Sequence, residues 1–362
     1  MNSDFSTVFK INGQEVALSN LADHCTGIIN TTVQDWEKQL YGFILEFINP
    51  EPYIVVQTSG STSVPKEISI EKQKMIASAR MTLAFLDLKS NDRALLCLPV
   101  TYIAGKMMVV RALVGGLHLI ATESTGTPAL GEVKEVEFAA MVPMQVHNLM
   151  KTAAGRSILD GIKKLIIGGG PVDQKQERQL NDRLCEAFST YGMTETLSHI
   201  AMRRLNGAGK SDYYSILPGI EIGQTEESCL TIDAPHLVEE KLITNDVVEL
   251  LSKEQFKIIG RKDNIINSGG VKVMPEKLEK QIGQFISSGF VLSSIPDDRL
   301  GERLVLVIEG EPLPNEREEK LIELLRGILN KYEMPRKICY LRQLPEVGNN
   351  KIDRKEIKRL IK

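Results

Sequence analysis

The residues best suited to chemistry stand in one short stretch, where hydroxyl side chains, a glycine and a lysine follow one another. These residues are Thr58, Ser59, Gly60, Ser61, Thr62 and Lys66. The apolar run before them, residues 53–56, has the length and composition of a buried strand. Backbone N–H groups, hydroxyls and an ammonium in such a loop can converge on one phosphate chain. The spacing differs from the usual P-loop, because no glycine precedes Lys66 and no hydroxyl residue follows it.

A second polar stretch, residues 189–196, places an aromatic ring, hydroxyls and a carboxylate in one turn after another apolar run. Its central residues are Thr190, Tyr191, Gly192, Thr194 and Glu195. Gly192 allows the backbone to approach a neighbour closely, since it has no side chain. Each stretch alone is most simply an ordinary polar loop, so the interpretation depends on the rest of the chain.

The segments around these stretches alternate between strand-like apolar runs and helical patterns. Helices are expected over residues 33–48, 71–86, 103–114, 143–151 and 173–183, and strands over residues 94–99, 117–121, 138–142, 164–167 and 185–189. This alternation predicts an α/β fold with a doubly wound, mostly parallel sheet, whose ligands lie at the carboxyl ends of the strands. Residues 1–50 are expected to contain a single helix.

A change of pattern predicts two further regions. Short alternating runs over residues 198–259 indicate a small antiparallel or barrel-like β region. A polar break at residues 260–263 is followed by a compact α+β segment. We therefore expect a large N-terminal domain over residues 1–260 and a small C-terminal domain over residues 264–362.

Composition excludes several classes of protein. The chain has 362 residues, 42% of them hydrophobic, and a net charge of −3, which gives no electrostatic reason to expect nucleic acid as a partner. Its five cysteines are scattered, so neither a zinc site nor a disulfide framework is expected, and a cytoplasmic location fits. No signal peptide is visible, and no run approaches the roughly 18 apolar residues of a membrane span.

Together, the two polar stretches resemble motifs of the adenylate-forming superfamily, which includes acyl-CoA ligases, nonribosomal adenylation domains and luciferases. Further motifs follow in the family's order. Residues 98–105 are similar to the segment that presents a gate residue, here Tyr102, to the acyl pocket. Residues 168–171 resemble the turn beside the adenine, residues 260–270 the hinge motif, and residues 348–354 the C-terminal lysine loop.

The resemblance implies ATP, Mg²⁺ and coenzyme A as cofactors and co-substrates. The residues implied in catalysis are Lys66, Thr194, Glu195 and Lys351, with Glu195 also the metal ligand. The residues implied in nucleotide binding are Thr58, Ser59, Gly60, Ser61, Thr62, Gly169, Gly170, Pro171, Thr190, Tyr191, Gly192, Asp246 and Arg261.

The family also performs a second step, in which coenzyme A takes the acyl group. The small domain then rotates about a hinge, here residues 261–263 with Asp263 as the pivot. The turn Ser268, Gly269 and Gly270 would line the channel for coenzyme A, since it leaves room close to the backbone.

The acid substrate is indicated by residues 191–199, which most resemble o-succinylbenzoate–CoA ligases of menaquinone biosynthesis. Ser198 and His199 then join Tyr102 in the substrate pocket. A second carboxylate needs a cation or several donors, and Lys106 and Arg111 are candidates. Three alternatives stay open: a ligase for another aryl or acyl acid, an adenylation protein that loads a carrier-protein arm, and a non-enzymatic nucleotide-binding regulator.

Overall fold

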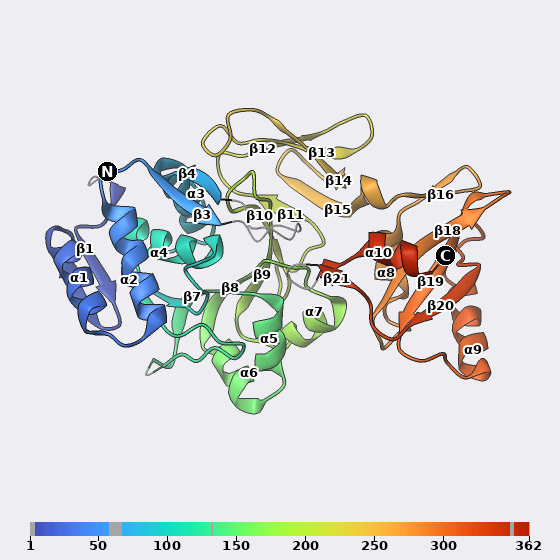
Figure 1. The fold of residues 1–362 in the computed structure, drawn as a ribbon, viewed down its shortest axis with the longest axis horizontal. Coiled ribbons are helices and arrows are strands. Elements are labelled where there is room, and N and C mark those ends of the chain that lie inside the picture. Colours follow the sequence, from blue (N-terminus) through green and yellow to red (C-terminus); the bar gives the residue numbers. More distant parts are fainter. Residues whose placement is uncertain (1–3, 58–66, 132, 348–350, 362) are drawn as a thin grey trace. The chain divides into compact units, whose positions relative to one another are not determined.

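The computed structural model describes residues 4–57, 67–131, 133–347 and 351–361. The chain forms two compact units, one of residues 1–221 and 233–241, the other of residues 222–232 and 242–362. Figure 1 shows the elements of each unit. The domain boundary expected at residues 261–263 differs from this division and stays a prediction.

The first unit is built on a sheet with the strand order β11-β10-β9-β8-β7-β5-β6-β1-β2. The strands from β9 to β1 in this order are parallel, and the pairs β9–β10, β10–β11 and β1–β2 are antiparallel. The strands are β1 (Val8–Ile11), β2 (Gln14–Ala17), β5 (Arg93–Leu96), β6 (His118–Ala121), β7 (Val136–Met141), β8 (Ile162–Ile167), β9 (Glu186–Gly192), β10 (His199–Arg204) and β11 (Tyr214–Ile216). The expected α/β class with a mostly parallel sheet is confirmed.

Helices follow the strands as the alternation predicts. They are α1 (Leu21–Thr31), α2 (Asp35–Ile48), α3 (Lys72–Phe85), α4 (Ile103–Gly115), α5 (Pro143–Met150), α6 (Ala153–Asp160) and α7 (Gln174–Leu180). Asp173 caps α7, because its carboxylate accepts a hydrogen bond of 2.7 Å from the backbone N–H of Gln176. The helix ends at Leu180, earlier than expected, and α6 was not predicted.

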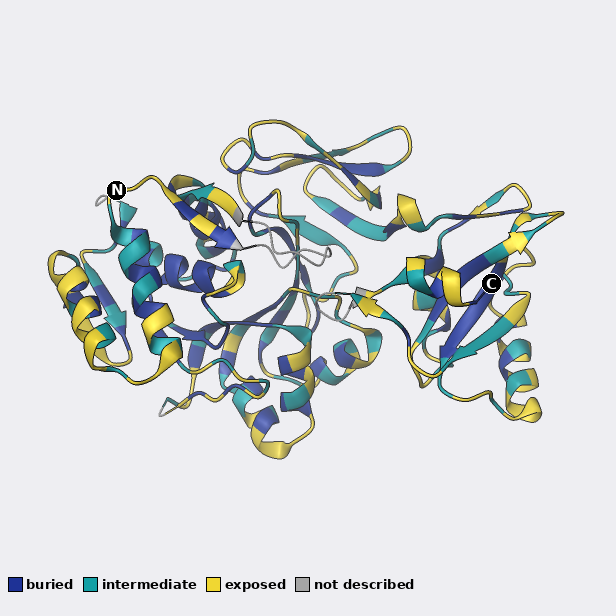
Figure 2. Cartoon of the chain, in the orientation of Figure 1, coloured by how far each residue is buried: buried dark blue, intermediate teal, exposed yellow. Residues whose placement is uncertain are grey.

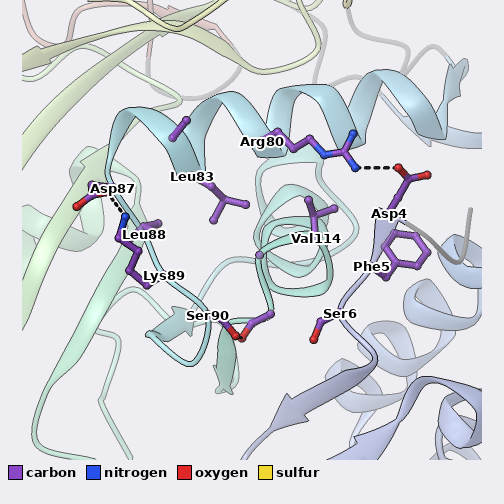
Figure 3. A pocket seen from close by; sticks show the side chains of 13 residues that line it. Asp4, Phe5, Ser6, Arg80, Leu83, Asp87, Leu88, Lys89, Ser90 and Val114 are labelled. Carbon is purple, nitrogen blue, oxygen red and sulfur yellow. Dashed lines mark hydrogen bonds and ion pairs between the residues drawn. The ribbon is translucent and has the colours of Figure 1, made fainter.

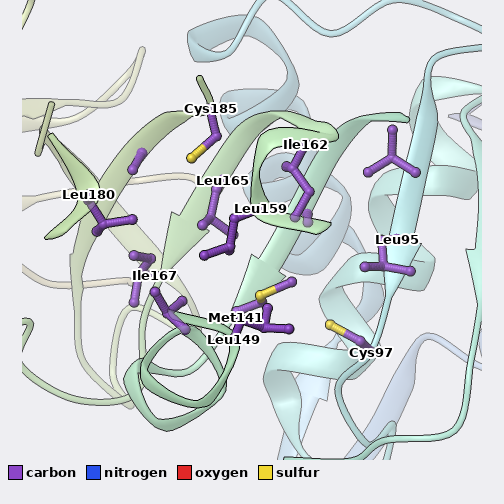
Figure 4. Packing of buried hydrophobic residues seen from close by; sticks show 14 of the residues in the cluster. Leu95, Cys97, Met141, Leu149, Leu159, Ile162, Leu165, Ile167, Leu180 and Cys185 are labelled. Carbon is purple, nitrogen blue, oxygen red and sulfur yellow. The ribbon is translucent and has the colours of Figure 1, made fainter. Parts of the chain in front are cut away.

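The core of this unit lies against the parallel strands (Figure 4). Every second residue of these strands faces this core. Examples are Leu95, Met141 and Ile167, which pack in one cluster with Leu149 of α5 and other helical side chains. The intervening strand residues, for example Phe138, are buried as well. Burial on both faces explains why these strands appear in the sequence as continuous apolar runs.

The N-terminal segment differs from the expectation of a single helix. It contains the hairpin β1–β2 and the additional helix α1, and β1 extends the main sheet beside β6. Asn12 and Gly13 form the hairpin turn with φ values of 46° and 80°. A two-residue turn that matches the twist of its flanking strands requires a positive φ at both positions. This Asn-Gly pair between short apolar runs was the signal that could have revealed the hairpin.

The strand before the first polar loop is not fully buried, contrary to expectation. β3 (Tyr53–Gln57) pairs with β4 (Glu67–Glu71) in a two-stranded sheet. Ile54 and Val56 are buried, whereas Tyr53 and Val55 are 53% and 52% exposed. Figure 2 shows buried and exposed segments across the chain. Because the hairpin packs through one face only, its strands alternate between buried and exposed side chains.

The second unit joins an antiparallel β region to a compact α+β segment. The first region has the order β12-β13-β14-β15, and the second has the order β17-β16-β19-β18 with β20 beside β19. Its elements are β12 (Glu221–Gln224), β13 (Cys229–Asp233), β14 (Leu242–Leu250), β15 (Gln255–Arg261), β16 (Ile266–Ser268), β17 (Val271–Val273), α8 (Pro275–Ile282), β18 (Phe290–Asp297), β19 (Gly301–Glu309), α9 (Asn315–Arg326), β20 (Lys337–Leu341), β21 (Glu346–Val347), β22 (Lys351–Ile352) and α10 (Arg354–Leu360). The sequence predicts strands over residues 290–295, 304–309 and 337–341 and helices over residues 276–282, 315–331 and 353–361. All are confirmed, although α9 ends at Arg326, earlier than predicted.

Candidate active site

The turn between β9 and β10 presents the two polar side chains that the sequence singles out. Thr194 and Glu195 are exposed, whereas Thr196 is fully buried. The hydroxyl of Thr196 accepts a hydrogen bond of 3.0 Å from the Met193 N–H and can donate to the Met193 or Ser198 carbonyl, at 3.1 and 2.9 Å. Thr196 therefore fixes the turn from inside and leaves Thr194 and Glu195 facing outward.

Gly192 is needed for the close approach of the two strands. A Cβ atom at this position would lie 2.4 Å from the Ser198 carbonyl oxygen, which no real side chain tolerates. The glycine predicted for close backbone contact thus serves the fold of the turn.

The glycine turn at residues 168–171 lies against Thr190. A Cβ atom on Gly168 would meet the Thr190 hydroxyl at 2.5 Å, and Gly169 has a φ of 81°. Thr190 also donates a hydrogen bond of 3.3 Å to the Ile167 carbonyl. The structure therefore brings two of the predicted nucleotide-binding segments together at the carboxyl ends of β8 and β9.

A network behind Tyr191, which we name the nucleotide-side network, was not foreseen from the sequence. It consists of Tyr214, Ser189, Arg203 and Glu177. The ring of Tyr214 lies 5.9 Å from that of Tyr191, edge to face, and its hydroxyl lies 3.2 Å from the Ser189 hydroxyl. The Arg203 guanidinium lies 5.7 Å from the Tyr214 ring and forms an ion pair with Glu177.

The charge of Arg203 is compensated within this network. Burial lowers the pKa of Arg203, but the hydrogen bond and charge of Glu177 outweigh burial and leave the pKa above its ordinary value. Each member of the network thus contacts another member, and together they support the ring of Tyr191.

A second network, which we name the acid-side network, surrounds the predicted pocket residues Ser198 and His199. Arg111 of α4 donates a hydrogen bond of 3.2 Å to the Ser198 hydroxyl, which lies 3.4 Å from His199 Nδ1. His199 Nε2 lies 3.0 Å from the Thr82 hydroxyl, which donates to the Ser78 carbonyl. These contacts form one directed chain if His199 carries its proton on Nε2.

Burial holds this histidine neutral. His199 is buried, and burial, reinforced by the Arg111 charge, keeps the pKa of His199 well below its ordinary value. His199 therefore acts as a fixed hydrogen-bonding link at neutral pH and carries no charge of its own.

Arg111 differs from Arg203 in lacking a carboxylate. Its side chain is buried, its Nε atom has no hydrogen-bond partner, and no carboxylate among the described residues forms an ion pair with it. Burial lowers the pKa of Arg111 to about 9. A buried cation without a counter-ion is costly, so this position is suited to a ligand that brings a negative charge.

The other candidate cation, Lys106, points elsewhere. Its ammonium lies 4.2 Å from the Phe43 ring and 3.9 Å from the Glu46 carboxylate, both on α2. Tyr102, the predicted gate, precedes α4 and is 52% exposed. Gly105 lets the first turn of α4 pack on Pro99, because a Cβ atom there would lie 2.3 Å from the Pro99 carbonyl oxygen.

In the second unit, the predicted ribose and hinge residues lie together. Arg261 donates to Asp246 at 3.3 Å and to Asp263 at 3.2 Å, and Asn245 donates to Asp263 at 3.2 Å. Asn245 thus contacts the predicted pivot. Ser268 ends β16, and Gly269 and Gly270 form the turn to β17 with φ values of 63° and 83°.

Some predicted residues lie outside this description. The loop of residues 58–66, with all its predicted phosphate ligands, lies outside the described residues, and so does the side chain of Lys351. Their roles stay predictions.

A metal would find one protein carboxylate at the turn. Among the described residues, no group of three or more His, Cys, Asp and Glu side chains could hold an ion. The exposed Glu195 fits a Mg²⁺ ion that takes most of its oxygens from phosphates and water, because Mg²⁺ often uses only one or two protein carboxylates.

A surface pocket of about 600 Å³ lies at the C-terminal ends of α3 and α4 (Figure 3). Its charged side chains already pair with one another, Arg80 with Asp4 at 2.8 Å and Lys89 with Asp87. The parallel strands β5 and β6 begin, rather than end, near this pocket. In this pocket, unlike at Arg111 of the candidate site, the charged side chains pair with one another, and the pocket does not lie at the carboxyl ends of the parallel strands.

In the part of the chain that the structure describes, no helix is long and apolar enough to cross a membrane.

Comparisons with known proteins point to one family. The sequence profile of a family described as AMP-binding enzyme matches residues 28–226. A 2-succinylbenzoate–CoA ligase of Bacillus cereus is 23% identical, in an alignment that covers 87% of this chain and 72% of that protein.

Solved structures agree. An acyl-CoA synthetase (AMP-forming)/AMP-acid ligase II-like protein from Dyadobacter fermentans is 35% identical with a TM-score of 0.63, over 93% of this chain and 98% of that one. The o-succinylbenzoate CoA synthetase (MenE) of Bacillus subtilis, solved with its acyl-adenylate OSB-AMP, has a TM-score of 0.68 at 21% identity, over 84% of this chain and 68% of that one. At that identity the second likeness shows the fold alone.

Proposed function

The chain belongs to the family of AMP-binding enzymes, and we propose that it is an acid–CoA ligase for o-succinylbenzoate in menaquinone biosynthesis. In the first step, a substrate carboxylate attacks the α-phosphate of ATP and pyrophosphate leaves. In the second step, the thiol of coenzyme A attacks the acyl carbon and AMP leaves. The names of the relatives in Bacillus cereus and Bacillus subtilis support this substrate.

The observation that carries the proposal is the Arg111 cation, which is buried beside Ser198 and forms no ion pair with a carboxylate among the described residues. o-Succinylbenzoate has two carboxylates, of which one is activated and the other keeps its charge. Arg111 would bind the second carboxylate, and Ser198 and the neutral His199 would hold the guanidinium in place. A monocarboxylate such as benzoate would leave the Arg111 charge unpaired, which disfavours its binding.

Activation would take place at the turn between β9 and β10. Glu195 would hold Mg²⁺, whose charge would neutralise the phosphates of ATP. Thr194 would donate a hydrogen bond to the α-phosphate as charge develops there. The turn at Gly169, Gly170 and Pro171 and the residues Thr190, Tyr191 and Gly192 would enclose the adenine, with Tyr191 held by Tyr214.

The remaining contacts come from residues with family roles. Ser59, Ser61, Thr62 and Lys66 would bind the outer phosphates, together with Thr58 and Gly60 of the same loop. In the second unit, Asp246 would accept hydrogen bonds from the ribose hydroxyls, and its 3.3 Å contact with Arg261 orients that carboxylate.

Lys351 would stabilise the charge that moves onto the phosphates during the first step. Rotation about Asp263 would then withdraw Lys351 and bring Ser268, Gly269 and Gly270 to the adenylate for the second step. A cytoplasmic location belongs to the proposal, because all five cysteines are free thiols, as expected in a reducing compartment.

A product screen tests the function. The protein is incubated with ATP, Mg²⁺, coenzyme A and one acid at a time, and the thioester is measured by mass spectrometry. We expect thioester formation from o-succinylbenzoate well above that from benzoate or a medium-chain fatty acid. A higher rate with either monocarboxylate would refute the proposed substrate, and a product that forms only on a carrier protein would refute the coenzyme A step.

A further inference from the structure

Two glutamates on α8 connect the start of α10 to the segment around the predicted hinge. Glu276 and Glu279 are three residues apart and therefore lie on one face of the helix. Glu279 accepts a hydrogen bond of 2.7 Å from the Leu292 N–H and one of 2.6 Å from Arg354. Arg354 in turn donates to the Leu292 carbonyl at 3.0 Å, so the two side chains together bind both backbone polar groups of Leu292 in β18.

Glu276 extends this contact to the hinge. One of its oxygens accepts a hydrogen bond from Asn264, which directly follows Asp263, and lies 3.9 Å from Arg354 Nε. The other oxygen is buried against Gly260, where a Cβ atom would approach it to 2.7 Å. Thus the Glu276 carboxylate lies against Gly260 before the predicted pivot and Asn264 after it, and it also lies near Arg354 of α10.

Arg354 also lies three residues after the predicted catalytic lysine. β22 (Lys351–Ile352) ends two residues before Arg354, and Asp353 between them caps α10 by accepting from the Lys355 and Glu356 N–H groups at 3.1 and 3.0 Å. The Arg354 side chain is only 23% exposed and that of Glu279 17%. Burial raises the pKa of Glu279 and the Arg354 charge opposes that rise, so loss of Arg354 would leave an unpaired buried carboxylate.

We propose that Arg354, Glu276 and Glu279 form a clamp that holds the Lys351 strand and the hinge segment together, which makes Arg354 a positioning residue for adenylation. The inference rests on the proposed function, since it assigns Lys351 to the first step only. A reacting group displaced by about 1 Å can lose roughly 10²-fold in rate. A loosened clamp therefore slows adenylation, whereas the second step does not use the lysine.

The test compares the two half-reactions in the full-length protein. Arg354→Gln is expected to slow single-turnover adenylation, measured by pyrophosphate release, about 10- to 100-fold. Thioester formation from preformed acyl-adenylate and coenzyme A should stay within about threefold, which also shows that the variant is folded. Arg354→Lys keeps the charge but loses the fork that reaches both Leu292 and Glu279, so its adenylation rate should fall in between.

Arg359→Gln is the matched control. Arg359 lies on the same helix, is 75% exposed and pairs only at the surface with Glu356, so both steps should keep their rates. A second arm tests the connection to the hinge. Glu276→Gln alone should also slow adenylation, and the double variant with Arg354→Gln should be no slower than Arg354→Gln alone, since the residues act as one unit.

Equal slowing of both steps by Arg354→Gln would mean a merely structural role and would overturn the inference, as would unchanged rates or additive effects in the double variant. The proposed function fails differently. In that case the unmodified protein would show no acid-dependent pyrophosphate release at all.

Discussion

Two buried arginines flank the turn between β9 and β10, and they differ in one respect. Arg203, 8% exposed, forms an ion pair with Glu177 and faces the ring of Tyr214. Arg111, 2% exposed, meets the Ser198 hydroxyl and has no carboxylate partner among the described residues. The nucleotide-side network is thus complete in itself, whereas the acid-side network lacks one negative charge.

In the proposed site, the nucleotide-side network and the acid-side network would therefore have different tasks. Adenine is neutral, so in the proposed site the network behind it would need only to hold an aromatic ring firmly. A dicarboxylic acid brings a charge that must be matched, and a buried cation provides that match without competition from water. Four measurements test this contrast.

The largest effect is expected from Arg111→Gln. Without the cation, the second carboxylate of o-succinylbenzoate is buried unpaired, so kcat/KM for this acid should fall about 10²–10³-fold. The substrate's monomethyl ester, which lacks that charge, should react at a similar rate with either protein, and KM for ATP should not change. An equal loss with diacid and ester would contradict the assigned role.

The same substitution at the two arginines should have different effects on stability. Arg203→Gln leaves the partly buried Glu177 without its partner and should lower the free energy of unfolding by roughly 3 kcal/mol. Arg111→Gln removes an uncompensated charge, so it should leave that free energy unchanged or raise it. Urea unfolding of the ligand-free proteins measures both values. Equal destabilisation would show that Arg111 has a structural counter-charge.

The acid-side network should respond to high pH. The pKa of Arg111 lies at about 9, so the free protein loses this charge as the pH rises through that value. Carboxylate binding favours the charged form. Hence KM for o-succinylbenzoate should rise about tenfold between pH 8 and pH 10. KM for the monomethyl ester should stay level over this range, and a parallel rise with the ester would contradict the assignment.

The smallest effect is expected from Tyr214→Phe. The variant keeps the ring behind Tyr191 but loses the hydroxyl, which contacts Ser189 at 3.2 Å and also hydrogen-bonds Arg203. One hydrogen bond of about 0.5–1.5 kcal/mol corresponds to a rise of roughly threefold in KM for ATP. KM for the acid should not change, and a change in it alone would show that the two networks are not separate.

Much of the architecture was predictable because it depends on local patterns. Apolar runs such as residues 165–167 indicated strands, and Asp173 indicated the start of α7. The family, its α/β class and its use of ATP, Mg²⁺ and coenzyme A followed from motifs whose residues are neighbours in sequence. The hairpin at Asn12 and Gly13 was missed although its signal is equally local.

Other features could not be predicted from local patterns. The alternation of exposed and buried residues in β3 depends on what packs against the hairpin. The clamp of Arg354 with Glu276 and Glu279 joins residues about 80 positions apart. The charge of each side chain does not indicate which of the many opposite charges in the sequence it will pair with.

The chemical groups of the proposed site could be predicted from the sequence. Its polar turns carry their hydroxyls, glycines and carboxylate in adjacent positions. The packing of the helices decides which cation is available to the acid in the proposed site. Lys106 and Arg111 lie on the same helix, five residues apart, and therefore point in different directions. The packing of α4 turns Lys106 toward Glu46 and Arg111 toward Ser198. A side chain's neighbours depend on how helices pack, so the composition of α4 alone could not distinguish these two positive charges.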